Sequence, residues 1–504
     1  MEKEKYLYGA AVQGIQNFIF QTNELKDIVG ASELVEEICT SAFDEFASEN
    51  GESILRAAGN IKFIFNEEED CKKAVREFPK KVMEMAPGIT ISQAVVKFTD
   101  FEKAVDELES RLRTQRNKPM NSTTLGLMGI LKSRKTGLPA TSHDKDEDEY
   151  LDAATYEKRY ESDKVKKNRR KRTTKKLCEK SFNIKNISDG LIAYNIEDIT
   201  KKNDWIAVIH ADGNGLGQIV QKIGKNKDTF SKFSKKLDKA TIESANAAFV
   251  SVKEKCQITD TEIIPIRPIV LGGDDLTVIC RGDIAIDYVT EFLRQFEEKS
   301  KEHLGKIIKD HNIFEGGADS LTACAGIAFI KSSYPFYYGY DLAESLCSEA
   351  KKDAKSDEHK KANNGLAPSC LMFHKVQDSF VEDYKEIVKR ELTPCDSFTF
   401  KYGPYYVNEL DGRWTIKKLQ DQISLLEGKE GNAVKSHLRQ WMSLMHNGNE
   451  AAKQKLFRLL EILTNTELKK LVLTVTGDPN KSPVYDMLAL YSISNQTTKK
   501  EEDK

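Results

Sequence analysis

The same order of strands and helices occurs twice in this chain. In residues 6–118 the apolar runs YLYGAAV, SILRAA, IKFIF and ITISQAVVKF alternate with two amphipathic stretches, one through LKDIVGASELVEEICTSAFDEF and one near residues 67–86. From Trp205 the order returns, with strands WIAVIH, IIPIRPIVL, LTVIC and LTACAGIAFI, a long helix to about Lys255 and a helix near 284–304. This order is typical of a ferredoxin-like layer. The sequence therefore predicts an α+β fold with two copies of that layer.

Two further segments lie outside the repeats. Between about residues 119 and 200 the periodicity fades, and the acidic stretch SHDKDEDEYLD precedes the basic stretch KRYESDKVKKNRRKRTTKK, which is typical of a charged, partly helical insertion. Towards the C-terminus, amphipathic runs such as AVKSHLRQWMSLM predict helices. We therefore expect four parts: residues 1–118, 119–200, 201–376 and a mainly helical part, 377–504.

Composition limits the class of protein. A length of 504 residues is too long for one core. With a net charge of -2, any contact with nucleic acid must be local. No apolar run approaches the roughly 18 residues of a membrane span, and the charged start MEKEKYLYGAAV does not resemble a signal peptide, so we expect a cytoplasmic protein. The nine cysteines are scattered and form no C-x-x-C pair, which argues against a disulfide framework and a zinc knuckle.

The stretch IVLGGDDLTVIC, residues 269–280, places two glycines and two aspartates between apolar runs. The strand that opens the second repeat ends in Asp212. Carboxylates at a strand end and at a hairpin tip are hard oxygen ligands that suit Mg²⁺, and a metal pair can activate a 3′-hydroxyl and neutralise a triphosphate. We therefore predict nucleotidyl transfer at Asp212, Asp274 and Asp275, with Gly272 and Gly273 leaving room for the nucleotide.

A bare hairpin turn is the alternative interpretation, because turns favour Gly and Asp. Asp212, followed by the Gly-rich turn DGNGLGQ into a helix, favours catalysis. Two other nucleotide-binding motifs are absent: DGNGLGQ does not match the dinucleotide-binding motif G-x-G-x-x-G, and no P-loop of the form G-x-x-x-x-G-K-[ST] occurs. We interpret His143 and Asp144 as a solvent-exposed pair, not a metal phosphohydrolase centre.

Four segments resemble a known family. HADGNGLG, LGGDDLTVI and AGIAFIKSSYPFYYGYDLAESLCSEAK resemble the second palm domain of the large subunit of type III CRISPR effector complexes, which is related to GGDEF-type nucleotide cyclases. VQGIQNFIFQTNELKDIVGASELV resembles the first palm of that family. The resemblance covers about residues 6–118 and 200–376, and implies synthesis of cyclic oligoadenylate second messengers from ATP in antiviral defence, with two Mg²⁺ or Mn²⁺ ions. A downstream effector would respond to the cyclic nucleotide.

The resemblance also implies residue roles. The metal ligands would be Asp212, Asp274, Asp275 and the carbonyl group of Gly213, and the nucleotide would contact Gly213, Gly272, Gly273 and Lys351. Lysine is a flexible point charge that suits a polyphosphate. The run EAKKDAK leaves a solvent-exposed role for Lys351 equally open.

The chain also departs from the family. Because the resemblance to the first palm begins near residue 6, we expect no nuclease domain of the kind that many members have, and Ser133 to Thr141 resembles a zinc-knuckle remnant without cysteines. A stand-alone relative is therefore an alternative to a CRISPR subunit. In the first repeat, Gly59 and Asn60 align with the two hairpin aspartates, and Gln13 aligns with Asp212. This degenerate palm cannot hold two Mg²⁺ ions, and we expect it to pack against the active palm and shape the nucleotide site.

Two other functions remain open. In a scaffold or RNA-binding subunit, the palms would be structural, and the basic run near 164–176 would contact phosphates or remain a solvated loop. A template-dependent polymerase ranks lowest, because no thumb or fingers segment with a basic groove is evident. Analysis of the products would separate a cyclase from a polymerase.

Overall fold

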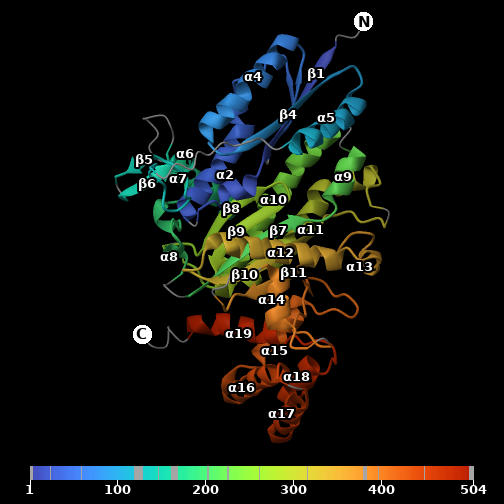
Figure 1. Cartoon of the computed structure of the whole chain (residues 1–504). Helices are drawn as coiled ribbons and strands as arrows, with labels where there is room; N and C mark the ends of the chain where they lie inside the picture. Colours follow the sequence, from blue (N-terminus) through green and yellow to red (C-terminus); the bar gives the residue numbers. More distant parts are fainter. Residues whose placement is uncertain are drawn as a thin grey trace. The chain divides into compact units, whose positions relative to one another are not determined.

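A computed structural model shows a mixed α/β chain (Figure 1). The described residues are 4–22, 24–57, 59–118, 129–145, 147–160, 169–200, 204–223, 226–259, 261–314, 316–378, 383–395, 397–447 and 449–498. The chain divides into two compact units. The first comprises residues 1–196, 216–242 and 268–274, and the second comprises residues 197–215, 243–267 and 275–504.

The first sheet has the strand order β2-β3-β1-β4, and β1 is antiparallel to both of its neighbours. Its strands are β1 (Lys5–Gln13), β2 (Glu52–Ala57), β3 (Asn60–Phe65) and β4 (Thr90–Phe98). The accompanying helices are α1 (Ile15–Ile19), α2 (Leu25–Cys39), α3 (Ser41–Asp44), α4 (Glu68–Met85) and α5 (Phe101–Arg116). These elements follow the predicted order of strand, helix, hairpin, helix, strand.

Both faces of this sheet are buried, because side chains alternate along β1. Leu7 packs on one face against Leu108 of α5. Tyr8 lies on the other face, where its ring stacks on Phe43 at 5.8 Å, and Phe43 contacts Phe78 of α4 at 5.1 Å. The sheet is therefore the core of the first unit.

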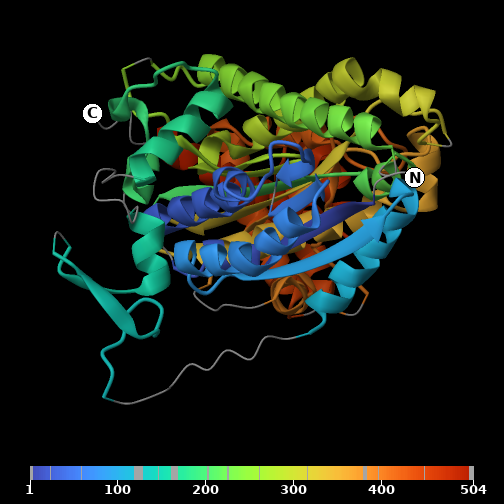
Figure 2. The same cartoon turned by 90° about the horizontal axis from the view of Figure 1, so that it is seen from above.

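The segment after the first repeat contains a short hairpin followed by helices. Its elements are β5 (Ala140–Asp144), β6 (Glu149–Asp152), α6 (Ala153–Arg159), α7 (Arg169–Phe182), the short helix η1 (Asp189–Leu191) and α8 (Ile196–Ile199). Figure 2 shows the β5–β6 hairpin extending away from the four-stranded sheet. Residues 164–168 of the basic run lie outside the described residues, and the rest of the run begins α7.

The prediction of a solvent-exposed His143–Asp144 pair is wrong for Asp144. That side chain is buried, accepts a hydrogen bond from Tyr160 at 2.7 Å and lies 3.6 Å from the guanidinium group of Arg159. His143 is partly exposed and pairs with Asp148 instead, at 3.1 Å. The sequence did not reveal this difference because Asp144 is buried by contacts with the helix that follows the hairpin.

The second sheet has six strands in the order β12-β11-β10-β7-β9-β8. Its strands are β7 (Trp205–Gly213), β8 (Ile266–Gly272), β9 (Asp275–Arg281), β10 (Ala323–Lys331), β11 (Cys370–Lys375) and β12 (Tyr405–Tyr406). The sequence β8-β9-β7-β10 within it has the same relative order as β2-β3-β1-β4. The first four strands of each repeat are therefore arranged alike.

The helices after β7 differ in one respect from the prediction. The long helix expected up to Lys255 is two helices, α9 (Leu216–Ile223) and α10 (Lys227–Lys255). The carboxamide oxygen of Asn226 accepts a hydrogen bond from the backbone N–H of Thr229 at 3.0 Å, and such a side chain favours the start of a new helix. The elements that follow are η2 (Gly282–Ile284), α11 (Ala285–Asp310), α12 (Phe336–Ala354) and α13 (Asp357–Ala362).

The last part of the chain is mainly helical in its described residues. Its elements are α14 (Tyr384–Ile387), the π-helix η3 (Val388–Leu392), α15 (Ile416–Ser424), α16 (Gly428–Met445), α17 (Asn449–Ile462), α18 (Thr466–Thr476) and α19 (Val484–Thr498). The ring of Trp441 packs edge-on against Phe398 and Phe400, at 6.1 and 5.6 Å. Figure 1 shows α15 to α18 grouped together.

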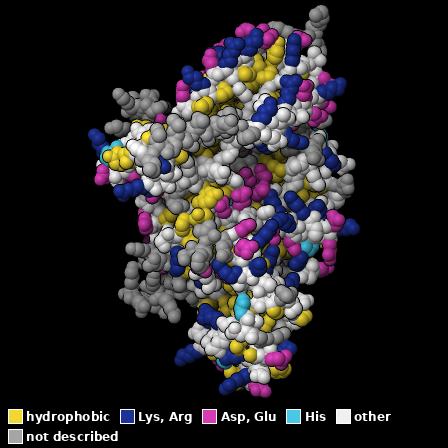
Figure 3. Space-filling view, viewed as in Figure 1, with side chains coloured by type: hydrophobic (Ala, Val, Ile, Leu, Met, Phe, Trp, Pro, Cys, Tyr) yellow, Lys and Arg dark blue, Asp and Glu magenta, His cyan; other side chains and the backbone are white. Residues whose placement is uncertain are grey.

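The mixture of charges on the visible surface agrees with the small net charge of the chain, which is -2. Figure 3 shows Lys and Arg side chains mixed with Asp and Glu side chains over the visible face. Among the described residues, no helix is both long enough and apolar enough to span a membrane.

Candidate metal and nucleotide site

The turn of the β8–β9 hairpin consists of Gly273 and Asp274. Gly273 has φ 63°, in the left-handed region that favours glycine, and a Cβ atom there would meet no heavy atom within 4 Å. At Gly272 the nearest atom to such a Cβ would be a carboxylate oxygen of Asp238, at 3.5 Å, which is an ordinary contact. The space beside this turn is therefore open.

Strand pairing brings Asp212 to the hairpin. The antiparallel register of β7 and β9 ends at Ala211 opposite Leu276, so the next positions along the two strands are Asp212 and Asp275. One carboxylate oxygen from each of Asp212, Asp274 and Asp275 lies within 4.8 Å of the others. All three side chains are partly exposed. The three predicted aspartates therefore form one cluster that can offer oxygen ligands to a divalent cation.

Lys351 reaches the same cluster from α12. Its ammonium group forms an ion pair with Asp212 and donates a hydrogen bond to the carbonyl group of Gly213 at 3.0 Å. The side chain is only 15% exposed, so Lys351 is not a solvated lysine. Gly326 permits this placement, because a Cβ atom at that position of β10 would lie 1.9 Å from the carbonyl oxygen of Ala343 in α12. The helix that carries Lys351 therefore lies directly on the sheet.

Burial and charge alter the acid–base properties of the site. Burial, then the negative charge of Asp212, raise the pKa of Asp275 to about 7, although Lys351 opposes the change. For Lys351, burial acts to lower the pKa, but the charge of Asp212 and the hydrogen bond with it prevail, and the pKa is raised. Three carboxylates beside one ammonium group leave a local excess of negative charge, which a bound cation would relieve.

Sequence reasoning missed two residues of the site. The carboxylate of Glu344, on α12, acts to raise the pKa of Asp275. Asn214 is buried, and its backbone N–H donates to the carbonyl oxygen of Thr322 at 2.7 Å while its side chain donates to the hydroxyl of Thr322 at 3.1 Å. These bonds hold the chain immediately after the Asp212–Gly213 corner. The segment HADGNGLG contained a signal for Asn214, and Glu344 lies in another segment that resembles the second palm, but no pattern there distinguished its carboxylate from those of its neighbours.

The corresponding hairpin of the first sheet has no acidic ligands. β2 ends at Ala57 and β3 begins at Asn60, so Gly59 and Asn60 take the places of Asp274 and Asp275 as predicted. The register pairs Asn60 with Ala11, so Ala11 rather than Gln13 matches the position of Asp212. The prediction that Gln13 matches Asp212 is wrong, because the strand register places Gln13 two residues beyond the position that faces Asn60. The expected lack of carboxylates is unaffected.

A second acidic group lies on α10 and α11, where Glu243, Glu302 and His303 approach one another. The imidazole Nε2 atom of His303 is 2.7 Å from a carboxylate oxygen of Glu243. This hydrogen bond links the two helices, so helix packing explains why the three side chains lie close together.

Comparison with known proteins shows that part of the chain is similar to a family. Residues 205–360 match the family described as Cas10/Cmr2, second palm domain. The aspartate cluster and Lys351 both lie within the matched residues. The resemblance to the large subunits of type III CRISPR effector complexes is therefore confirmed for this part of the chain.

The chain also resembles solved structures in fold. It is similar to a Csm1-Csm4 cassette in complex with cA3, with a TM-score of 0.52 and 14% identity over 98% of this chain and 69% of that chain. The cassette in complex with cA4 gives a TM-score of 0.51 and 13% identity over 98% of this chain and 70% of that chain. The Csm1-Csm4 subcomplex in the type III-A CRISPR-Csm interference complex gives a TM-score of 0.50 and 14% identity, over 98% of this chain and 70% of that chain. No curated protein matches the chain.

Proposed function

We propose that the palm domain is a metal-dependent nucleotidyltransferase that converts ATP into cyclic oligoadenylate and releases pyrophosphate. The observation that carries this proposal is the approach of Asp212, Asp274 and Asp275 within 4.8 Å of one another, with the ammonium group of Lys351 beside them. A structural turn needs no third carboxylate from another strand and no buried lysine. The palm family and the fold shared with complexes containing cA3 and cA4 support the same reaction.

The donor set fits two Mg²⁺ or Mn²⁺ ions. The three carboxylates are hard oxygen ligands, and the carbonyl group of Gly213, which already accepts a hydrogen bond from Lys351, is a further oxygen at the same corner. Bound divalent ions would favour loss of the proton from a 3′-hydroxyl and neutralise charge on a triphosphate. Asp275 must be ionised to serve as a ligand, so its raised pKa links metal binding to pH.

Lys351 and the hairpin glycines would bind the nucleotide. When a cation takes over the charge of Asp212, the ammonium group of Lys351 becomes available to phosphate oxygens, for which a flexible point charge is suited. Gly272 is not required by internal packing, since a Cβ atom there would make only an ordinary contact at 3.5 Å. A nucleotide lying against the hairpin would explain why residue 272 has no side chain. It would also explain the open space at Gly273.

The first sheet would be a degenerate palm. Its strand order matches that of the second sheet, but Ala11, Gly59 and Asn60 provide no carboxylate. We propose that it supports the active palm without binding metal, and that the four parts expected from the sequence are the functional divisions of the chain. The complexes that the chain resembles in fold contain Csm1 with Csm4, so we extend the proposal to CRISPR-type subunits and RNA as partners.

The direct test is to incubate the purified chain with each labelled nucleoside triphosphate and Mg²⁺ or Mn²⁺, with and without RNA. Mass spectrometry of the products should show cyclic oligoadenylate from ATP and pyrophosphate release. Long linear products that require a template would instead identify a polymerase. Absence of any product under all conditions, from a protein that still binds RNA, would favour the scaffold function.

A further inference from the structure

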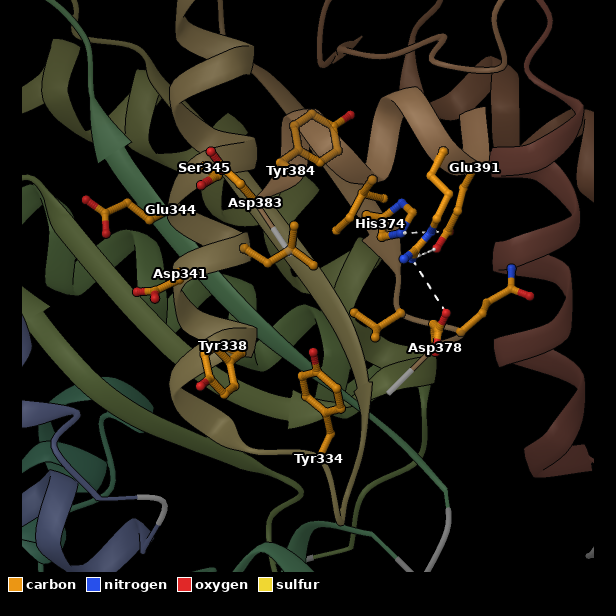
Figure 4. A pocket seen from close by; sticks show the side chains of 15 residues that line it. Tyr334, Tyr338, Asp341, Glu344, Ser345, His374, Asp378, Asp383, Tyr384 and Glu391 are labelled. Atoms are coloured by element: carbon orange, nitrogen blue, oxygen red, sulfur yellow. Dashed lines mark hydrogen bonds and ion pairs between the residues drawn. The ribbon is translucent and has the colours of Figure 1, made fainter. Parts of the chain in front are cut away.

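Two pockets among the described residues of the second unit have similar volumes but different charge. The first, of about 390 Å³, lies between α12, the end of β11 and the α14–η3 segment (Figure 4). Its lining includes Asp341, Glu344 and Asp383, while Arg390 is paired with Asp378 at 3.6 Å and with Glu391 at 2.7 Å. The excess of carboxylates disfavours anionic ligands in this pocket.

The second pocket, of about 420 Å³, has no acidic residue in its lining. It is formed by β11 and the residue two positions beyond it, by α16 with the residue that follows it, and by α19. The lining residues are Lys375, Gln377, Arg439, Met442, Ser443, His446, Tyr485, Leu488, Ala489 and Ser492. Its volume falls within the roughly 300 to 1,000 Å³ that is usual for sites of small ligands.

Lys375 is a half-buried cation without a carboxylate partner among the described residues. Its ammonium group donates to the hydroxyl of Ser492 at 2.5 Å and lies 4.4 Å from the ring centroid of Trp205. The charged groups that act on it are Lys331 and Arg439, both cationic, and burial together with these charges lowers the pKa of Lys375 to about 8. The surroundings of Lys375 therefore lack the negative charge that a half-buried ammonium group favours.

Arg439 adds a second positive charge to the same pocket. The described part of the chain provides no ion pair for its guanidinium group, whose planar fork can donate two hydrogen bonds to one phosphate. The hydroxyl of Ser492 accepts a hydrogen bond from Lys375 at 2.5 Å and donates to the carbonyl oxygen of Ala489 at 2.7 Å, so it positions the ammonium group of Lys375 in the pocket. The hydroxyl of Ser443 donates to the carbonyl oxygen of Arg439 at 3.2 Å and keeps acceptor lone pairs for N–H or O–H groups of a ligand.

The rest of the lining is apolar and aromatic. Met442, Leu488 and Ala489 provide a hydrocarbon wall, and Tyr485 and His446 provide rings. Such a wall suits the flat face of a nucleobase, whereas a free inorganic anion would gain nothing from it. The pocket therefore combines positive charge for a phosphate with an apolar surface for a base.

We propose that this pocket binds a nucleoside phosphate, with Arg439 and Lys375 at the phosphate and the base against Met442 and Leu488. This site is distinct from the aspartate cluster and does not depend on the proposed synthesis of cyclic nucleotides. The ligand is a small nucleotide, not an RNA strand, because all the complementary features lie within one pocket. Its binding should need no divalent metal.

The test is equilibrium dialysis of labelled AMP with the full chain, in excess EDTA so that the aspartate cluster holds no metal. Arg439→Gln should weaken AMP binding by about tenfold, the effect of losing a charged hydrogen-bonding partner. Ser492→Ala, a small change that preserves the fold, should weaken it by about threefold. The matched control is Arg458→Gln, on the exposed surface of α17 and outside the pocket lining, which should leave AMP binding unchanged.

Three outcomes would overturn the proposal. The first is AMP binding to the wild-type chain that neither Arg439→Gln nor Ser492→Ala weakens, and the second is no AMP binding at millimolar concentration. The third is a competition experiment in which inorganic phosphate or a single-stranded RNA oligonucleotide binds to the pocket but AMP does not. Retention of AMP binding by the Asp274→Ala/Asp275→Ala double variant would separate this site from the aspartate cluster and support the proposal.

Discussion

Lys351 forms an ion pair with Asp212 and donates a hydrogen bond to the carbonyl group of the next residue, Gly213, at 3.0 Å. The lysine thus contacts two of the groups that we propose as metal ligands. This arrangement lowers the electrostatic cost of clustering three aspartates in the absence of a cation. It also implies that metal and Lys351 compete for Asp212 until a nucleotide supplies the lysine with new negative charge.

Replacing Lys351 with methionine should therefore have two opposite effects. Removal of the competing ammonium group should raise the affinity for Mg²⁺ in the absence of nucleotide, by about threefold to tenfold. The same variant should lose at least about tenfold in turnover of ATP, because the contact with the triphosphate disappears. Calorimetric titration of Mg²⁺ and a steady-state assay would measure the two effects.

Lys352 provides the matched control for that variant. It is 63% exposed and pairs with Glu349 on the surface of the same helix. Lys352→Met should change neither Mg²⁺ affinity nor turnover. If Lys351→Met weakened Mg²⁺ binding, the competition between lysine and metal would be refuted.

Metal binding should depend on pH through Asp275. Its pKa is raised to about 7, first by burial and then by the charge of Asp212. Since only the ionised carboxylate binds metal, protons compete with Mg²⁺ below about pH 7, and the affinity should fall by up to about tenfold for each pH unit from 7 to 5. Titration of Mg²⁺ at pH 5.5, 6.5 and 8 would test this slope. An affinity that is constant over this range would show that Asp275 is already ionised or is not a ligand.

The sequence predicted the parts of the site that depend on local pattern. The glycines and aspartates of the hairpin could be located because a tight turn between two apolar runs is encoded within twelve residues. Asp212 could be linked to them because a repeated strand order fixes which strands are neighbours. The register error at Gln13 shows the limit of this reasoning, since Ala11 is the residue that pairs with Asn60.

Long-range packing could not be predicted in the same way. Asp27 and Arg159 form a buried pair although they are 132 residues apart in the chain, and no sequence pattern around either residue indicates the contact. The position of Lys351 depends on the close approach of α12 to Gly326. Glycine within an apolar strand indicates such an approach, but does not say which element approaches.

The pair of Asp27 and Arg159 should be important for stability. Both side chains are almost fully buried, and they form two hydrogen bonds, at 2.6 and 3.1 Å. Arg159→Ala should lower the free energy of unfolding by about 3 to 5 kcal/mol, because an uncompensated carboxylate remains buried. The exposed Lys103, which pairs with Asp100, supplies the control, since Lys103→Ala should have an effect near zero. Chemical denaturation measures both, and equal effects would contradict the assigned role of the buried pair.

Asp486 should make the stability of the second unit depend on pH. It is buried and accepts a hydrogen bond from the hydroxyl of Tyr405 at 2.7 Å, and burial raises the pKa of Asp486 to about 7. The folded chain therefore binds this proton more tightly than the unfolded chain, whose pKa is near 3.8. Stability from this group is fully present below about pH 4 and is lost as the pH rises to about 7.

Asp486→Asn removes that titration while keeping an oxygen acceptor for Tyr405. The variant should therefore show a smaller fall in melting temperature between pH 5 and pH 8 than the wild-type chain, and should be the more stable of the two at pH 8. Melting curves at several pH values provide the measurement. Parallel curves for the two proteins would mean that Asp486 does not retain its proton in the folded chain.

The central claim is that Asp274 and Asp275 belong to a metal site that carries out nucleotidyl transfer. Mass spectrometry of the products made from ATP and Mg²⁺ tests it most directly, with the Asp274→Ala/Asp275→Ala double variant beside the wild-type chain and Asn60→Ala as the control at the matching hairpin. We predict oligoadenylate from the wild-type chain, at least about a thousandfold less from the double variant, and a yield within a few-fold of wild type from Asn60→Ala. Oligoadenylate from the double variant at the wild-type rate would show that the active site lies elsewhere.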